Sequence, residues 1–176
     1  MRTLTIIGLA CVALVACGGA KVMTEPPGPD ATAEELTAAC EGPFPRTCAR
    51  LGKLSEMGPK PDLVRATDLY RRACEAGDPE GCGRFGIQLR MGVEGHRDSH
   101  LAAIYLTKAC KNGWIPACNQ AGVLYERGDG VAKDEQLAAQ LYTVACNDGE
   151  VRACTNLGNV YVDGTALPRD DAFAVK

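Results

Sequence analysis

The sequence has few aromatic residues and no excess of charge of one sign. Phe, Trp and Tyr make up 5% of the 176 residues, and 19 basic against 22 acidic residues give a formal net charge of −3. It also contains no lysine- or arginine-rich run. The electrostatic footprint of a nucleic-acid-binding protein is therefore missing, and we expect no nucleic-acid partner.

Residues for hydrolytic or metal chemistry are scarce as well. The chain has two serines, Ser55 and Ser99, and neither begins an S-x-x-K motif. Its two histidines, His96 and His100, lie four residues apart in a polar stretch. This pair could hold a metal weakly, although solvated loop histidines are the commoner explanation. We assign no catalytic residue, cofactor or metal, and the residues favour a non-catalytic protein.

One apolar run is present, from Leu4 to Ala16 after the basic Arg2. It is too short to span a bilayer as a mature helix and predicts a cleaved signal peptide over residues 1–16. The run ends in Leu-Val-Ala-Cys17, which resembles the lipobox of bacterial lipoproteins. We expect a lipid on Cys17 and a protein anchored in the bacterial cell envelope, at the outer membrane, facing the periplasm or the surface. An ordinary secretory cleavage or an uncleaved anchor is the alternative.

A proline-rich stretch follows the predicted lipid site. Residues 17–30 include Pro26, Pro27 and Pro29 and predict an extended, lipidated tether without packed structure. From Ala31 the composition changes to Ala, Glu and Leu. Residues 31–176 are therefore expected to form the folded domain.

The cysteines of this domain fall into a repeat. The pattern C-x7-C occurs four times, with starts 34, 36 and 36 residues apart, at Cys40/Cys48, Cys74/Cys82, Cys110/Cys118 and Cys146/Cys154. In an exported chain an even set of cysteines indicates disulfides. The repeat favours pairing within each bracket. Reduced, buried cysteines and a zinc site remain the alternatives.

Other residues recur at the same period and predict helices. Asp62, Asp98, Asp134 and Asp170 occupy one position, where Asp caps the start of a helix that runs into the next bracket. A second helix begins inside each of the last three brackets, over residues 79–91, 116–127 and 152–163, with the second cysteine in its first turn. Gly86, Gly122 and Gly158 recur in the middle of these second helices, where glycine lowers helix propensity, so we expect a neighbouring helix to approach closely there.

The stretch Ala121-Gly-Val-Leu-Tyr-Glu-Arg-Gly-Asp-Gly-Val-Ala-Lys-Asp134, with Ala138, Tyr142 and Ala145-Cys146 after it, resembles a Sel1-like repeat. With its cysteine brackets the chain is similar to the exported, cysteine-rich Hcp-like group. The resemblance implies an all-α fold, an α/α superhelix of about four disulfide-stapled helix pairs related to tetratricopeptide arrays, with the last unit incomplete. It also implies a scaffold for protein contacts. Some relatives have been described as β-lactam-binding proteins or β-lactamases, which gives an alternative function.

The resemblance to tetratricopeptide arrays also suggests where a partner binds. The second residue after each bracket is polar in every unit, as Arg50, Arg84, Gln120 and Asn156. In such arrays the matching position lines a concave groove, and Arg127 would extend the row. The alternative is a plain solvated helix face. We expect an unidentified protein or peptide partner there, with an envelope glycan as a further candidate, and expect Trp114 to cover a disulfide or to support a ligand.

Overall fold

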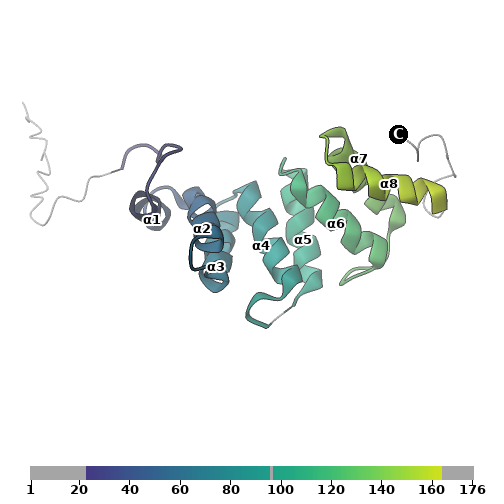
Figure 1. Ribbon diagram of the computed structural model, residues 1–176, viewed down its shortest axis with the longest axis horizontal. Coiled ribbons are helices and arrows are strands. Elements are labelled where there is room, and N and C mark those ends of the chain that lie inside the picture. Colours follow the sequence, from purple (N-terminus) through teal and green to yellow (C-terminus); the bar gives the residue numbers. More distant parts are fainter. Residues whose placement is uncertain (1–22, 96, 164–176) are drawn as a thin grey trace, which may run out of the picture.

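The computed structural model describes residues 23–95 and 97–163, and this part of the chain is built from helices without a strand (Figure 1). The predicted signal peptide, Cys17, His96 and Asp170 lie outside the described residues. The elements are α1 (Ala33–Glu41), η1 (Pro45–Thr47), α2 (Cys48–Met57), α3 (Leu63–Glu75), α4 (Pro79–Met91), η2 (Val93–Gly95), α5 (Ser99–Lys111), α6 (Pro116–Arg127), α7 (Glu135–Asn147) and α8 (Val151–Asp163).

The helices form an arc in which each packs on the next one along the chain (Figure 1). Helices α1, α3, α5 and α7 lead into the cysteine brackets, and α2, α4, α6 and α8 follow them. Helix α4 also contacts α2 on one side and α6 on the other. The array is a helical solenoid, as the repeat predicts. No helix in the described ranges is both long and apolar enough to cross a membrane.

The predicted aspartate caps are confirmed in three units. The side chains of Asp62, Asp98 and Asp134 each accept a hydrogen bond from the backbone N–H three residues later, at 2.8–2.9 Å. These bonds satisfy amides that have no acceptor inside the helix. Helices α4 and α6 have the predicted bounds.

All four brackets form disulfides, with Cα–Cα distances of 4.3–4.8 Å. The pairs are Cys40–Cys48, Cys74–Cys82, Cys110–Cys118 and Cys146–Cys154. The alternatives of reduced cysteines and of a zinc site are therefore wrong for these eight residues.

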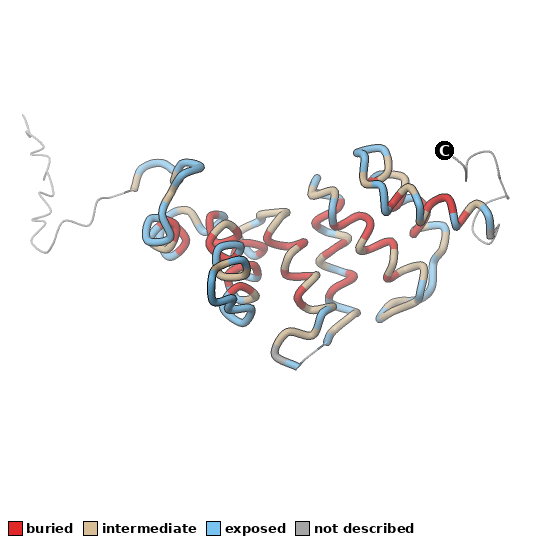
Figure 2. Tube along the Cα trace, in the orientation of Figure 1, coloured by how far each residue is buried: buried red, intermediate tan, exposed pale blue. Residues whose placement is uncertain are grey.

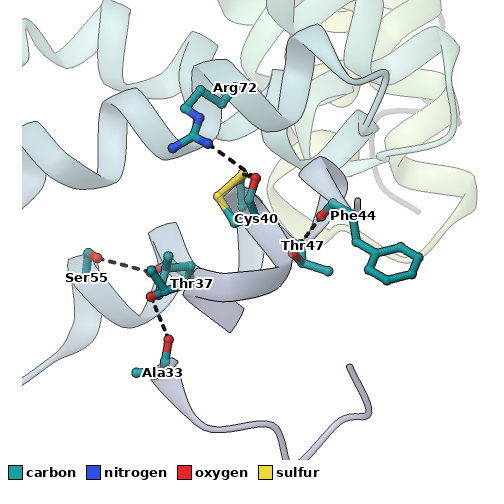
Figure 3. Close-up of a disulfide and its surroundings, with 9 residues drawn as sticks. Ala33, Thr37, Cys40, Phe44, Thr47, Ser55 and Arg72 are labelled. Carbon is teal, nitrogen blue, oxygen red and sulfur yellow. Dashed lines mark hydrogen bonds between the residues drawn. A yellow bond between two sulfur atoms is a disulfide. The ribbon is translucent and has the colours of Figure 1, made fainter. Parts of the chain in front are cut away.

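Glycine turns bring the second cysteine of a bracket back to the first. Gly77, Gly113 and Gly149 follow the last helical turn with φ of 82–93°, a left-handed conformation that reverses the chain after a helix. At the first bridge the carbonyl of Cys40 also accepts a hydrogen bond from Arg72 of α3 at 3.2 Å (Figure 3). The bridge and this bond together hold the end of α1 against the next unit.

The first bracket departs from the other three. Its chain forms the 3-10 turn η1, and α2 begins only at Cys48. The corresponding helices α4, α6 and α8 begin two or three residues before their cysteine. Pro43 and Pro45 lie inside this bracket and explain the difference, because proline lacks the N–H that a regular helix would use.

The fourth bracket differs from the prediction at Cys154. Helix α8 was predicted to start at residue 152, but it begins at Val151, so Cys154 is the fourth residue of the helix and not the third. The cause is local: the Cys154 N–H donates to the Glu150 carbonyl at 3.2 Å and closes the first turn one residue earlier. Cys154 is also half-buried, whereas Cys82 and Cys118 are buried, because α8 packs mainly on α7 while α4 and α6 have helices on both sides.

Buried residues lie as stripes along the helices and face the neighbouring helices (Figure 2). The glycines in the middle of α2, α4 and α6 meet a large side chain of the next helix. A Cβ atom would lie 2.7 Å from the Tyr70 ring at Gly52, 2.8 Å from Leu106 at Gly86 and 2.6 Å from the Tyr142 ring at Gly122. The expected close approach is confirmed at Gly86 and Gly122, and Gly52 shows the same contact, since a side chain larger than hydrogen does not fit.

The end of the predicted tether is not free of the domain. Residues 23–30 form no helix, as expected, but the carbonyls of Pro27, Gly28 and Pro29 all accept hydrogen bonds from Arg50. Ala31 packs against the hydrophobic core that residues of α1, α2, α3 and α4 form. The prediction of an unpacked tether is therefore wrong for residues 27–29, because composition alone does not reveal a donor that comes from a distant helix.

Candidate functional site

The predicted row of polar residues lies along one layer of the solenoid. Arg50, Arg84, Gln120 and Asn156 come from α2, α4, α6 and α8, and we call them the helix-A row. Their surroundings differ from unit to unit. Arg50, Arg84 and Asn156 hydrogen-bond to other parts of the chain, whereas the amide of Gln120 makes no hydrogen bond to a described residue.

Arg50 is bound to the chain's own N-terminal segment. Its guanidinium donates to the Pro27 carbonyl at 2.9 Å, to Gly28 at 2.7 Å and to Pro29 at 2.8 Å. One planar group with several N–H donors thus holds three consecutive carbonyls. At this end of the row an extended peptide backbone already occupies the predicted binding residue.

Arg84 is the centre of a half-buried network between neighbouring units. Its Nε donates to Glu80 at 2.7 Å and its Nη1 to Glu56 of α2 at 3.4 Å. The guanidinium also lies 5.6 Å from the centre of the Tyr70 ring and 5.9 Å from that of Trp114. A cation between two aromatic rings and two carboxylates joins α2, α3, α4 and the bracket before α6. Arg84 is therefore a structural contact between units rather than a free groove donor.

Glu56 connects this network to the core. It accepts hydrogen bonds from the Tyr70 hydroxyl at 2.6 Å and from the Gln88 amide at 2.9 Å. Burial, together with the Glu56 carboxylate, raises the pKa of Tyr70 well above its ordinary value. Gln88 is only 2% exposed, and its Oε1 has no hydrogen-bond partner among the described residues.

A second network joins the third and fourth units. Asn156 donates to Asn119 at 2.9 Å, and Asn119 donates to Glu150 at 2.8 Å. In the preceding unit the positions of Asn119 and Glu150 are taken by Gly83 and Trp114, which pack together. The same contact between units is thus polar at one junction and aromatic at the other. Asn156, like Arg84, serves that contact.

Gln120 and Arg127 remain available on α6. Gln120 is half-buried and makes no side-chain hydrogen bond to any described residue, and Arg127 is exposed. On the same faces of α2 and α4, Met57 and Met91 occupy the position of Arg127 and are 71% and 63% exposed. Methionine is a flexible apolar side chain that adapts to varied partners. The accessible part of the surface is therefore a mixed polar and apolar strip over α2, α4 and α6.

Two concave regions lie at the N-terminal end of the solenoid. One, of about 760 Å³, lies between α1, α2 and the loop around Pro59. The other, also of about 760 Å³, lies between α1 and residues 23–31. Both are bordered by Glu34 and Ala38 of α1. The cavities flank the helix that carries the chain from the Arg50-bound segment into the repeats.

The serines and the described histidine are not arranged as a hydrolytic site. Ser55 donates to the Leu51 carbonyl of its own helix at 3.1 Å, and Ser99 accepts from Arg97 at 3.0 Å. His100 binds the Gly130 carbonyl through Nδ1 at 3.0 Å. Within residues 23–95 and 97–163 neither serine is paired with a base, and no cluster of metal-binding side chains was found.

The cysteines of the described ranges offer no nucleophile either. Each of them, including the half-buried Cys154, is bonded to the other cysteine of its bracket. Nucleophilic attack and metal ligation both need a free thiolate. The brackets therefore serve the fold and supply no reactive group to a site.

Sequence reasoning found the row but missed what surrounds it. Glu56, Asn119 and Glu150 have no unusual pattern in the sequence, so their contacts across units were not predicted. Gln88 could have been noticed in the sequence, because it is polar where the other units have the apolar residues Leu54, Leu124 and Val160. Trp114 covers Gly83, which follows Cys82, and faces Arg84.

Comparison with known proteins identifies the repeat. A family model described as Sel1 repeat matches residues 45–78, 88–114, 115–150 and 151–176. The chain is similar to a Sel1 repeat protein from Oxalobacter formigenes, with 26% identity and a TM-score of 0.71 over 81% of this chain and 59% of that one. It is also similar to a protective antigen of uropathogenic Escherichia coli displaying an SLR fold, with 27% identity and a TM-score of 0.70, over 81% and 32% of the two chains.

Cysteine rich protein B of Helicobacter pylori shares the fold, with 23% identity and a TM-score of 0.54 over 72% of this chain and 98% of that one. No curated protein matches the chain. The chain spans 59% and 32% of the length of the Oxalobacter and Escherichia structures.

Proposed function

The chain belongs to the Sel1 repeat family, and from this membership we propose that it is a non-catalytic interaction module that binds a partner protein along α2, α4, α6 and α8. The proposal rests above all on Arg50, whose guanidinium holds three consecutive carbonyls of an extended chain. A solenoid layer that binds one extended segment at its first unit has the chemistry to bind a longer one along the following units.

The accessible strip supports the same function. Met57 and Met91 offer exposed apolar contacts on α2 and α4. Gln120 and Arg127 on α6 offer an amide and a guanidinium, neither of which makes a side-chain hydrogen bond to another residue within 23–95 and 97–163. Apolar anchors surrounded by polar groups are typical of surfaces that bind peptides and proteins.

We place the module in the bacterial cell envelope. Four disulfides require an oxidising compartment, as found for exported proteins. The segment Leu14-Val15-Ala16-Cys17 supports cleavage before Cys17 and lipid attachment to its sulfur. Labelling with a radioactive fatty acid tests this step: incorporation should be lost in Cys17→Ser, and label that persists in that variant would exclude lipidation at Cys17.

The binding surface is tested by capture of partners from crosslinked cell envelopes. The test variant is Gln120→Ala/Arg127→Ala, on α6. The matched control is Gln140→Ala/Lys108→Ala, which removes an exposed amide and an exposed cation from α7 and α5. We expect at least a fivefold loss of the captured partner for the test variant and recovery as in the wild type for the control.

Equal recovery by the two double variants would place the binding surface elsewhere. Arg84 and Asn156 are left unchanged in this experiment because they join neighbouring units. Circular dichroism of both variants verifies that the helices are intact.

A further inference from the structure

The bound segment 23–31 has its own chemistry. Pro27 and Pro29 flank Gly28, and the three carbonyls of this triplet converge on one guanidinium at 2.7–2.9 Å. Prolines lack an N–H and fix φ at about −65°, so two prolines this close together do not suit the interior of a helix or a sheet. Arg50 donates to the carbonyls of Pro27, Gly28 and Pro29, and the Gly28 carbonyl also accepts a hydrogen bond from the Ala31 N–H at 3.2 Å.

This contact is narrow. Most of residues 24–30 are exposed, with Pro27 half-buried. The region between the segment and α1 is a cavity of about 760 Å³, bordered by Glu34, Glu35 and Ala38 on the side of the helix. The segment is thus fixed at the Arg50 guanidinium and at the capping box of Thr32 and Glu35 that begins α1. Residues 27–29 are bonded to the helices through one guanidinium beside an open cavity, so they can be displaced while the capping box and the helices stay intact.

We propose that Arg50 is the recognition residue of a site for an extended, proline-containing peptide, that Pro27 to Pro29 fill this site in cis, and that an external peptide of the same chemistry binds by displacing them. The inference deepens the proposed function, on which it rests, by giving the class of partner chain and the place where binding starts. The covalent link makes the internal segment a strong competitor, because short linkages give effective concentrations on the order of millimolar. The apparent affinity for an external peptide is reduced by the fraction of sites that the internal segment leaves open.

The test measures binding of a labelled peptide of residues 24–31, Thr-Glu-Pro-Pro-Gly-Pro-Asp-Ala, to the full chain by fluorescence polarisation. In Pro27→Gly/Pro29→Gly the free internal segment is more flexible, so it loses more conformational entropy on binding and occupies the Arg50 site less of the time. We expect this variant to bind the peptide at least fivefold more tightly than the wild type does. Adding Arg50→Ala to it should abolish binding.

Two further protein variants and one peptide variant define the contact. Lys53→Ala removes an exposed cation one turn along α2 and should leave peptide affinity unchanged. Arg50→Lys keeps the charge but not the fork of N–H donors, so adding it to Pro27→Gly/Pro29→Gly, where the internal competitor is already weakened, should weaken binding at least fivefold even if Arg50→Ala proves unstable. A peptide with its prolines replaced by alanine should bind more weakly than the parent peptide.

Equal affinity in the wild type and in Pro27→Gly/Pro29→Gly would show that the internal segment does not compete, and the proposal would fail. Undiminished binding when Arg50→Lys is added to Pro27→Gly/Pro29→Gly would also overturn it. Either failure leaves the envelope capture experiment intact, because that experiment depends on Gln120 and Arg127 and not on Arg50.

Discussion

Trp114 rests directly on Gly83: a methyl group placed on Gly83 would overlap the indole ring. Trp114 lies in the bracket between α5 and α6, and Gly83 lies near the start of α4. The contact therefore joins two units, and the absence of a side chain at Gly83 creates the space for the ring. Because Trp114 is the single tryptophan of the chain, its fluorescence reports on this junction.

Gly83→Ala should displace the ring. We expect a red shift of the tryptophan emission and a loss of about 1–3 kcal/mol in the free energy of unfolding, as is typical when a packed site is overfilled. Both are measured in one urea titration followed by fluorescence. Gly28→Ala is the control, because a Cβ at Gly28 meets no atom within 4 Å. An unshifted emission in Gly83→Ala would mean that the ring does not pack there.

The disulfides are expected to stabilise each junction by a similar amount. Replacing Cys110 and Cys118 by alanine should lower the free energy of unfolding by about 2–3 kcal/mol, the value that the loop-entropy relation gives for so short a ring. Urea unfolding followed by circular dichroism measures the change. Mass spectrometry of an unreduced digest should recover four peptide pairs, each from one bracket, and a pair that joins two brackets would contradict the structure.

Replacing Arg84 should lower the free energy of unfolding by more than replacing an exposed arginine does. Its side chain is 22% exposed and contacts two carboxylates and two rings. We expect Arg84→Ala to lose about 2 kcal/mol of unfolding free energy, since hydrogen bonds to charged groups contribute about 1.5–3 kcal/mol. Arg71→Ala is the control: its side chain is 44% exposed, and its pairs with Asp68 and Glu75 lie within one helix. For it we expect less than about 1 kcal/mol.

Tyr70 and Tyr142 should destabilise the fold in alkaline solution. Burial, with the hydrogen bonds to Glu56 and Glu126, raises the pKa of both hydroxyls above the ordinary value of 10.0. Above pH 10 the unfolded chain therefore releases these protons while the folded chain keeps them. The free energy of unfolding should fall by about 1.4 kcal/mol per pH unit for each tyrosine.

In the double variant Tyr70→Phe/Tyr142→Phe, the free energy of unfolding should lack the decrease above pH 10 that the two tyrosines cause. Urea titrations between pH 9 and 11.5 measure it. From pH 7 to 9 the difference between variant and wild type should not change with pH, because neither state loses these protons. An alkaline slope as steep as that of the wild type would show that the two hydroxyls are not protected.

The repeat made much of the fold predictable from single positions. Asp62, Asp98 and Asp134 cap helices through bonds to their own next turn, so their role is local and visible in the sequence. The glycines opposite Leu106 and Tyr142 were predicted to lie at close helix contacts because a residue that disfavours helices recurred at one position. Only the structure shows which residue of the next helix each glycine faces.

The candidate site was less predictable. The helix-A row was identified by its polar pattern, but Arg84 and Asn156 bind neighbouring units while Gln120 does not. These differences depend on Glu56 and Asn119, which lie 28 and 37 residues away from the partners that they contact. No local pattern records such a pairing, because each residue would suit a solvated helix surface equally well.

The sequence by itself determined the helices, the period of the array and the cysteine brackets, because caps, turns and short loops depend on residues close together in the chain. The tertiary structure decided which polar residues join neighbouring units, that Trp114 lies on Gly83, and that Arg50 holds the backbone of Pro27 to Pro29. Those contacts depend on how consecutive units stack, and stacking is set by the packing of whole helices rather than by any one stretch of chain.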